Sequence, residues 1–190
     1  MKNETAKKKR GVLLYLFLVL VVFSLTRIFF FETYRIAHSS MNNTLFDGDK
    51  VLVSKRSKVT TNKVYVIQTR SETYVKRCVG IPGDIIKIIK GDVFINNKLI
   101  TFPRTIIGSD KSAADDFDIQ VTSFYNNNWT KDNFGPLVIP KGNYFFLGDN
   151  RPVTADSRTF GVIPKDKIVG RVCMILYSTY NWRRMFQQIQ

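Results

Sequence analysis

Residues 11–31 form an almost unbroken apolar run in which Arg27 is the only charged side chain. As an α-helix, a run of this length would measure roughly 31 Å, close to the thickness of the hydrocarbon core of a bilayer. A cleaved targeting peptide is the competing interpretation, but its apolar core is usually about 7 to 15 residues long and ends in small side chains. Residues 25–34 are mostly bulky instead. The run therefore predicts an uncleaved transmembrane helix that serves as an anchor.

The charges before this anchor predict its orientation. Lys7, Lys8, Lys9 and Arg10 precede it, and the positive-inside rule places such clusters in the cytoplasm. Residues 1–10 are therefore expected to be a cytoplasmic basic tail, and the chain after about Glu32 is expected to be extracytoplasmic. The predicted location is the cell (plasma or inner) membrane, crossed once.

The composition narrows the choice of partners. Lys and Arg number 29 against 15 acidic residues, which gives a formal net charge of +14. Such a field attracts either nucleic acid or anionic lipid headgroups. Because an exported domain seldom meets chromosomal DNA but always faces the outer leaflet of its own membrane, membrane lipids are the expected partner and nucleic acid is not.

Beyond the anchor the chain has the pattern of a mostly β protein, with short runs rich in Val, Ile, Tyr and Phe between Gly, Pro, Asn and Asp. We expect a β-barrel-like domain over residues 32–180 with a polar insertion around residues 105–133. The C-terminal segment, residues 181–190, is either a short interfacial helix or a plain helix covering the domain. The expected strands are 50–54, 63–69, 73–79, 85–89, 93–95, 99–100, 144–147 and 168–177.

The chain has few metal-binding side chains. It contains two cysteines, Cys78 and Cys173, and one histidine, His38. Because the cysteines lack the C-x-x-C spacing of a zinc site, neither a metal nor another cofactor is expected. Both lie in apolar strand-like runs and are interpreted as buried hydrophobic residues. A disulfide between them stays open in an exported domain.

Four short segments carry the chemistry. They are S-S-M-N-N-T-L at 39–45, G-D-K-V-L-V at 48–53, Y-V-K-R-C-V-G-I-P-G-D at 74–84 and G-D-N-R-P-V-T-A-D-S-R at 148–158. In order and in spacing from the anchor they resemble the motifs of bacterial type I signal peptidases (leader peptidases), which are serine proteases with a Ser/Lys dyad. The resemblance extends from the anchor to about Tyr177. It implies a membrane-bound endopeptidase whose partners are the N-terminal signal peptides that it removes from exported preproteins.

The residue chemistry is compatible with a serine nucleophile and a lysine base. A serine hydroxyl becomes a strong nucleophile when a base removes its proton. A Ser-His-Asp triad would have to use His38, and a lysine is the alternative base if burial lowers its pKa by several units. Strand alternation places Tyr74, Lys76 and Cys78 on one face, so Lys76 lies between apolar neighbours. Arg77, on the other face, is a poor base because a guanidinium keeps its proton.

The resemblance assigns the catalytic roles. Ser40, directly before Met41 of the motif, is implied to be the nucleophile, and Lys76 the general base. Only the register of the motif separates Ser40 from its neighbour Ser39. By itself, a serine in such a position would be interpreted as a turn or helix-cap residue.

The fourth segment is implied to support the dyad. Thr154 stands where the family has a serine that hydrogen-bonds the lysine. Asp156 and Arg158 are expected to form an ion pair that holds the loop, or else a surface pair worth under about 1 kcal/mol. His38 stands where some members have an oxyanion-binding serine and others have glycine. It either donates to the oxyanion alongside the Ser40 N–H or is an ordinary loop histidine.

The chain departs from the pattern of the family that it resembles in two places, which would make it a divergent member. The family usually has proline where Asn43 stands, and Asp-Asn where Pro152 and Val153 follow Arg151.

Three alternative functions stay open. One is a self-cleaving repressor-type protease, although such proteins carry a DNA-binding helical domain rather than an anchor. Another is a specialised signal peptidase of a pilus or conjugation apparatus. The third is a non-catalytic membrane-tethered homologue.

Overall fold

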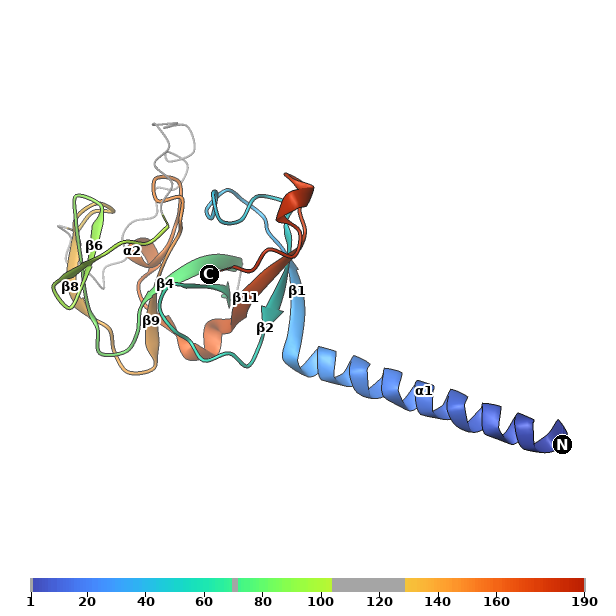
Figure 1. Ribbon diagram of the computed structural model, residues 1–190. Coiled ribbons are helices and arrows are strands. Elements are labelled where there is room, and N and C mark those ends of the chain that lie inside the picture. The colour runs from blue at the N-terminus through green and yellow to red at the C-terminus, as the bar shows by residue number, and fades with distance from the viewer. Residues whose placement is uncertain (1, 70–71, 104–128, 190) are drawn as a thin grey trace.

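The computed structural model describes residues 2–69, 72–103 and 129–189, and it is mostly β (Figure 1). One long helix, α1 (Lys2–Phe30), precedes strands that form two sheets. The strands are β1 (Phe31–Arg35), β2 (Lys50–Ser54), β3 (Lys63–Gln68), β4 (Thr73–Gly80), β5 (Ile85–Ile89), β6 (Asp92–Ile95), β7 (Lys98–Ile100), β8 (Phe134–Val138), β9 (Asn143–Leu147), β10 (Ile163–Pro164) and β11 (Ile168–Tyr177). The short helical segments are α2 (Ser157–Phe160), η2 (Lys165–Lys167) and η3 (Trp182–Arg184).

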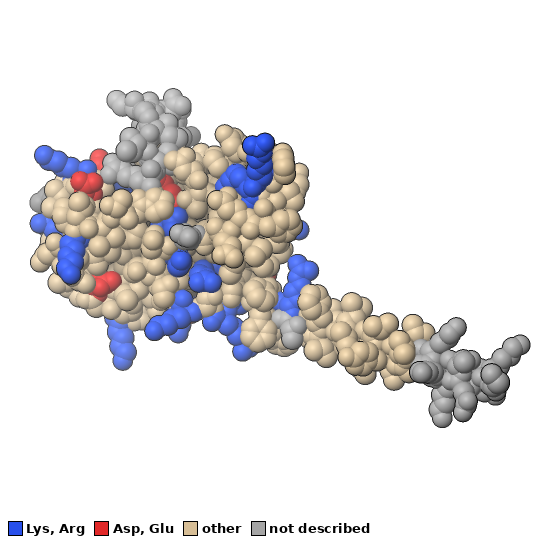
Figure 2. All heavy atoms as spheres, viewed as in Figure 1, with Lys and Arg blue, Asp and Glu red and all other residues tan. Residues whose placement is uncertain are grey.

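Helix α1 leads directly into the β domain, because it ends at Phe30 and β1 begins at the next residue. In Figure 1 the helix projects from one end of the domain. At the junction the guanidinium of Arg56 lies 4.9 Å from the centroid of the Phe30 ring, and Lys55 pairs with Glu32 at 3.2 Å. Figure 2 shows basic side chains near this junction and along the lower edge of the domain.

The apolar run over residues 11–31 is helical up to Phe30, and Phe31 already belongs to β1. Because bulky residues continue across this boundary, β1 has no separate signal in the sequence. Within the part of the chain that the structure describes, no helix is both long enough and apolar enough to cross a membrane.

The larger sheet has seven strands in the order β1-β2-β11-β3-β4-β9-β10, and its neighbouring strands are antiparallel. β11 lies between β2 and β3 although it follows all the other described strands along the chain. β3 is buried on both faces, with Val64 and Val66 in one apolar cluster and Tyr65 and Ile67 in another. The neighbouring strand β4 therefore runs through the interior of the domain.

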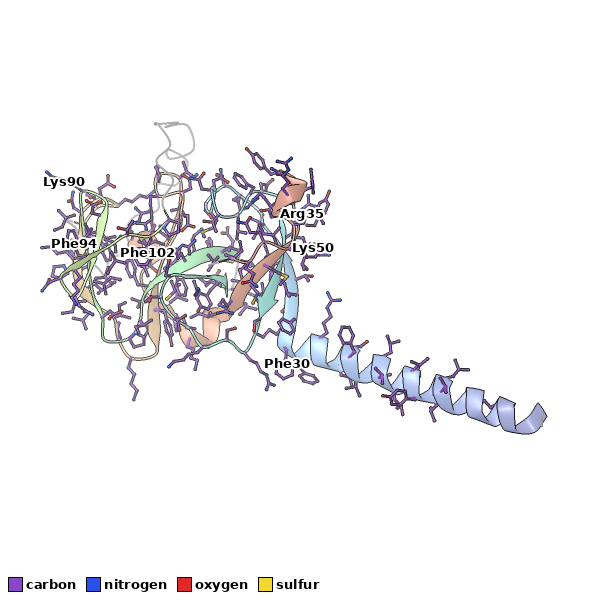
Figure 3. The ribbon with its side chains drawn as sticks, viewed as in Figure 1. Phe30, Arg35, Lys50, Lys90, Phe94 and Phe102 are labelled. Atoms are coloured by element: carbon purple, nitrogen blue, oxygen red, sulfur yellow. The ribbon has the colours of Figure 1, made fainter. Side chains whose placement is uncertain are left out.

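The smaller sheet has four strands in the order β7-β6-β5-β8. A turn at Asn96 and Asn97 joins β6 to β7, and both residues have positive φ, 51° and 65°, which asparagine tolerates better than most side chains. Figure 3 labels Phe94 and Phe102 in this part of the molecule, at the end of the domain that is far from Phe30. The smaller sheet thus lies away from the helix.

The expected strands agree with the structure to within one residue at each end. β1, β8 and β10 were not expected. Of the predicted polar insertion, residues 105–128 lie outside the described residues. Near its end, the ring of Trp129 packs against the buried Phe134 with centroids 4.7 Å apart.

In the structure the two cysteines form no disulfide, and the described part of the C-terminal segment contains a single helical turn. Both cysteines are free thiols, and Cys78 is buried while Cys173 is only half-buried. The C-terminal segment is neither of the two expected helices. It contains the three-residue turn η3 and then forms a bridge from Gln188 to Met174 of β11, so backbone pairing rather than a helical face attaches it.

Candidate active site

The first motif folds into a tight turn over residues 39–45, called the serine turn below. The N–H of Asn42 donates to the carbonyl of Ser39 at 3.0 Å, and the N–H groups of Thr44 and Leu45 donate to that of Met41 at 3.0 and 2.9 Å. The side chains of Met41 and Leu45 are fully buried in the core cluster beneath β2 and β11. Apolar packing therefore fastens the turn to the sheet.

Strand β4 brings Lys76 to this turn. Its Nζ lies 2.7 Å from Oγ of Ser40, which is 36 residues earlier in the chain. Lys76 is only 3% exposed, and its Nζ lies 5.6 Å from the ring centroid of Tyr74 on the same face of the strand. Tyr65 of β3 is paired directly opposite Lys76. The alternation expected for β4 thus places the amine among aromatic neighbours.

Burial is the largest influence on the pKa of Lys76 and lowers it from 10.5 to about 8, although the carboxylates of Asp156 and Asp149 act to raise it. Over the residues that the structure describes, no carboxylate is close enough to Lys76 for an ion pair. With a pKa of about 8, roughly one molecule in ten carries neutral Lys76 at pH 7. A neutral amine in contact with a hydroxyl can accept its proton, which is the action of a general base.

The two side chains meet at the wall of a pocket of about 270 Å³, whose lining also includes His38, Tyr74 and Val153. Ser40 is partly exposed there while Lys76 is buried. The hydroxyl can therefore be reached from solvent although its neighbouring amine is shielded. No group of three or more His, Cys, Asp or Glu side chains in the described ranges is placed to hold a metal ion.

Asp156 and Arg158 form a buried ion pair rather than a surface pair. Nε and Nη2 of Arg158 donate to the two carboxylate oxygens of Asp156 at 2.9 and 2.8 Å, and neither side chain is more than 3% exposed. Asp156 also accepts from the N–H of Gly148 at 3.1 Å. Burial acts to raise the pKa of Asp156, but the charge and hydrogen bonds of Arg158 outweigh it and hold this pKa below its usual value. The pair therefore closes the loop over residues 148–158.

Thr154 lies at the point where this loop meets the serine turn. Its Oγ1 donates to the carbonyl of Ala155 at 3.3 Å, and among the described residues no hydrogen bond joins it to Lys76. The orienting role expected for Thr154 stays a prediction. A Cβ on Gly148 would lie 2.6 Å from Oγ1 of Thr154 and 2.8 Å from the carbonyl oxygen of Ser40. Glycine is therefore required for this close approach.

Asn150 is a site residue whose role the sequence did not predict. Its backbone N–H donates to the carbonyl of Ser40 at 3.0 Å, and its side-chain Nδ2 donates to the carbonyl of Ser39 at 3.1 Å. It is 4% exposed. Through these two hydrogen bonds it ties the loop over residues 148–158 to the serine turn.

Arg77 and Asp149 form a second buried pair behind the serine turn. Nε and Nη2 of Arg77 donate to the two carboxylate oxygens of Asp149 at 2.8 and 2.7 Å, and each residue is 1% exposed. The hydroxyl of Thr44 donates to the same carboxylate at 2.5 Å. The serine turn is therefore hydrogen-bonded to a buried ion pair at its far end.

Asn43 and His38, on either side of Ser40, both have positive φ. Asn43 has φ of 82°, which proline cannot adopt because its ring holds φ near −65°. His38 has φ of 80°, the left-handed region where glycine is at ease and histidine is tolerated. The N–H of His38 donates to the carboxylate of Asp47 at 3.1 Å. The turn before Ser40 thus suits a glycine, and the turn after it differs in shape from one that contains proline.

Known proteins resemble the chain over nearly its whole length. A family model described as "Signal peptidase, peptidase S26" matches residues 9–177. Signal peptidase I T of Bacillus subtilis (strain 168) is 33% identical over 193 residues, covering 96% of this chain and 94% of that protein. Signal peptidase IB of Staphylococcus aureus (strain Mu50 / ATCC 700699) is 34% identical over 165 residues, covering 83% and 84%. A crystal structure of a signal peptidase I from Enterococcus faecalis V583 matches 60% of this chain and 97% of that chain, with 24% identity and a TM-score of 0.42.

Proposed function

The chain belongs to the signal peptidase family, peptidase S26, and on that premise we propose that Ser40 and Lys76 are the catalytic pair with which it works. The protein is a serine endopeptidase that removes signal peptides. The observation that carries the proposal is the 2.7 Å contact between Ser40 Oγ and the Nζ of a buried lysine whose pKa is lowered to about 8.

In the first half of the reaction, neutral Lys76 accepts the hydroxyl proton while Ser40 Oγ attacks the carbonyl carbon of the scissile peptide bond. The tetrahedral intermediate then collapses. The C–N bond breaks, the leaving amine takes the proton from the Lys76 ammonium, and the carbonyl carbon remains attached to Ser40 as an ester.

In the second half, Lys76 removes a proton from a water molecule, which attacks the ester carbon. The bond to Ser40 Oγ breaks, the serine recovers its proton from Lys76, and the signal peptide leaves with a free carboxylate. The Ser40 N–H and the ring of His38 are the groups that we propose as donors to the oxyanion in both halves.

The remaining site residues hold this pair in place. We assign to the buried pair of Asp156 and Arg158 the closure of the loop over residues 148–158, and to Thr154 the orientation of Lys76. Met41 fixes the serine turn because its side chain is fully buried in the core. The 2.7 Å contact between Ser40 Oγ and Lys76 Nζ supports the assignment of Ser40, rather than Ser39, as the nucleophile.

We propose a membrane-bound arrangement for the whole chain. Residues 1–10 are the cytoplasmic tail, residues 11–31 the anchor, residues 32–180 the extracytoplasmic catalytic domain and residues 181–190 its C-terminal segment. The apolar run in the sequence supports the anchor. Exposed Lys55 and Arg56 beside the end of α1 support contact with anionic lipid headgroups.

The test is cleavage of a preprotein with an Ala-x-Ala site by the purified protein in detergent. The wild type should cleave it, whereas Ser40→Ala and Lys76→Ala should each lose activity by at least about 1000-fold and stay folded. Ser39→Ala is the matched control and should be nearly silent. An inactive Ser39→Ala beside an active Ser40→Ala would show that the register is off by one. A folded wild type that cleaves no such substrate would contradict the proposal.

A further inference from the structure

The chain returns to the serine turn at its C-terminal end. Residues 178–184, called the strap below, follow β11 and lie against residues 44–49. Nη2 of Arg184 donates to the backbone carbonyl of Thr44 at 2.6 Å, and Nη1 donates to the carboxylate of Asp49 at 2.8 Å. The same guanidinium lies 4.4 Å from the centroid of the Phe46 ring. One side chain of the strap therefore holds the end of the serine turn and the residues just after it.

The rest of the strap fits the same surface. The ring of Tyr180 stacks on that of Phe46, with centroids 4.3 Å apart and planes 7° from parallel. The hydroxyl of Ser178 donates to the fully buried carboxylate of Asp49 at 2.7 Å. A Cβ on Gly48 would lie 2.7 Å from Oγ1 of Thr179, so the two segments are in close contact.

A short chain of hydrogen bonds connects Arg184 to the nucleophile. The N–H of Thr44 donates to the carbonyl of Met41, the residue after Ser40. On the other side of the turn, the N–H of Asn150 donates to the carbonyl of Ser40. Hydrogen bonds thus hold the serine turn at both ends, from the loop over residues 148–158 at its start and from Arg184 at its end.

We propose that Arg184 is a positioning residue for Ser40, so that the strap is part of the catalytic architecture although it touches neither substrate nor reacting atoms. The inference rests on the proposed role of Ser40 and Lys76. A guanidinium suits the task because its planar fork donates to the Thr44 carbonyl and the Asp49 carboxylate at once. Without these two hydrogen bonds the turn keeps its fold, but Ser40 Oγ is no longer held 2.7 Å from Lys76 Nζ.

The experiment compares Arg184→Ala, Arg184→Lys and the matched control Arg183→Ala in the full chain. Arg183 is the exposed neighbour in η3, and its guanidinium lies over the ring of Trp182. The values of kcat and KM are measured for a peptide with an Ala-x-Ala site. The kcat is expressed per folded molecule, and near-UV circular dichroism gives the folded fraction.

Arg184→Ala should lower kcat about 30-fold and leave KM within about threefold. Its pH profile should keep its midpoint near 8, because the burial of Lys76 and the charges of Asp156, Asp149 and Arg158, which set its pKa, are unchanged. Arg184→Lys should lie between the wild type and Arg184→Ala, since one ammonium does not match both acceptors. Arg183→Ala should behave as the wild type.

A folded Arg184→Ala with wild-type kcat, or with a loss confined to KM, overturns the inference. So does an equal loss in Arg183→Ala. If Arg184→Ala does not fold, a folded Arg184→Lys with wild-type kcat overturns it and one with a lowered kcat supports it. Failure of the proposed function looks different, because the wild type would then be inactive or Ser40→Ala would still cleave.

Discussion

Lys76 and Arg77 are consecutive residues of β4, and both are buried. Their side chains have different partners. Arg77 lies in a two-point ion pair with Asp149. Lys76 contacts a neutral hydroxyl instead, and the described residues include no carboxylate within ion-pair distance of it. The alternation of the strand, which turns the two side chains to opposite faces, makes this difference possible.

The consequence appears in the protonation of the two groups. A charge that is buried and paired stays charged and contributes to structure, although its removal leaves an uncompensated partner. A charge that is buried and unpaired is disfavoured, so its pKa falls, here to about 8 for Lys76. One strand thus carries a structural cation and a group that can act as a base near neutral pH.

Replacing Lys76 should produce the largest effect on activity with the least damage to the fold. We expect Lys76→Met to lower kcat/KM by at least about 1000-fold. The free energy of unfolding at pH 7 should be unchanged or higher, because an apolar side chain of similar length removes the cost of burying an amine. Peptide cleavage and denaturant unfolding measure the two quantities. A clear loss of stability would show that Lys76 is a structural cation like Arg77.

Breaking the Arg77 pair should do the reverse and act mainly on stability. Arg77→Met or Asp149→Leu alone should lower the free energy of unfolding by about 3–5 kcal/mol, because each leaves one buried charge without its partner. The double variant should recover much of this loss. Denaturant titration of the three variants checks the prediction, and equal destabilisation by the single and double variants would contradict it.

The pH dependence of cleavage and of stability should show, without a mutation, that Lys76 loses its proton near neutral pH. Below a pKa of about 8 for Lys76, kcat/KM should rise about tenfold per pH unit, and it should level off above that value. The pKa of an unfolded lysine is higher, so between about pH 8 and 10.5 the unfolded state binds more protons and stability should rise with pH. A rate that is flat from pH 6 to 10 would exclude Lys76 as the base.

Thr154 tests whether Lys76 depends on a second hydroxyl. Because Oγ1 of Thr154 donates to the carbonyl of Ala155, Thr154→Val should lower kcat by less than about tenfold, and Thr154→Ser should stay close to the wild type. Steady-state kinetics with an Ala-x-Ala peptide measures the change. A loss above about 100-fold would mean that this hydroxyl turns to Lys76 during the reaction.

Cys78 should give the smallest effect. It follows Lys76 on the same face, is fully buried, and burial raises the pKa of its thiol to about 12, so it stays neutral. Cys78→Ser replaces a small apolar side chain by a hydroxyl and should weaken cleavage about two- to threefold through packing. The same assay measures it, and complete loss of activity would give this thiol a role that its chemistry does not indicate.

The sequence predicted those parts of the molecule that have a local signal. Short runs rich in Val, Ile, Tyr and Phe predicted β2, β4 and β11, and strand alternation placed Lys76 and Arg77 on opposite faces. β1 was missed because its Phe31 continues the apolar run of the preceding residues. The Asn150 contact with Ser39 joins residues 111 apart and the Arg77 pair joins residues 72 apart. Such partners leave no pattern within a window of neighbouring residues, so only the fold reveals them.

The position of β11 in the larger sheet also determines when the sheet can be completed during synthesis of the chain. Because β2 and β3 pair with β11 and not with each other, each keeps an open edge until residues 168–177 have been synthesised and docked. Contacts of such long sequence separation form late in folding, and open edges recruit other strands. A nascent chain that has reached only β9 contains Ser40 and Lys76. It lacks β11, the strand that joins β2 to β3 in the larger sheet. We therefore expect proteolytic activity to appear only after translation has passed β11.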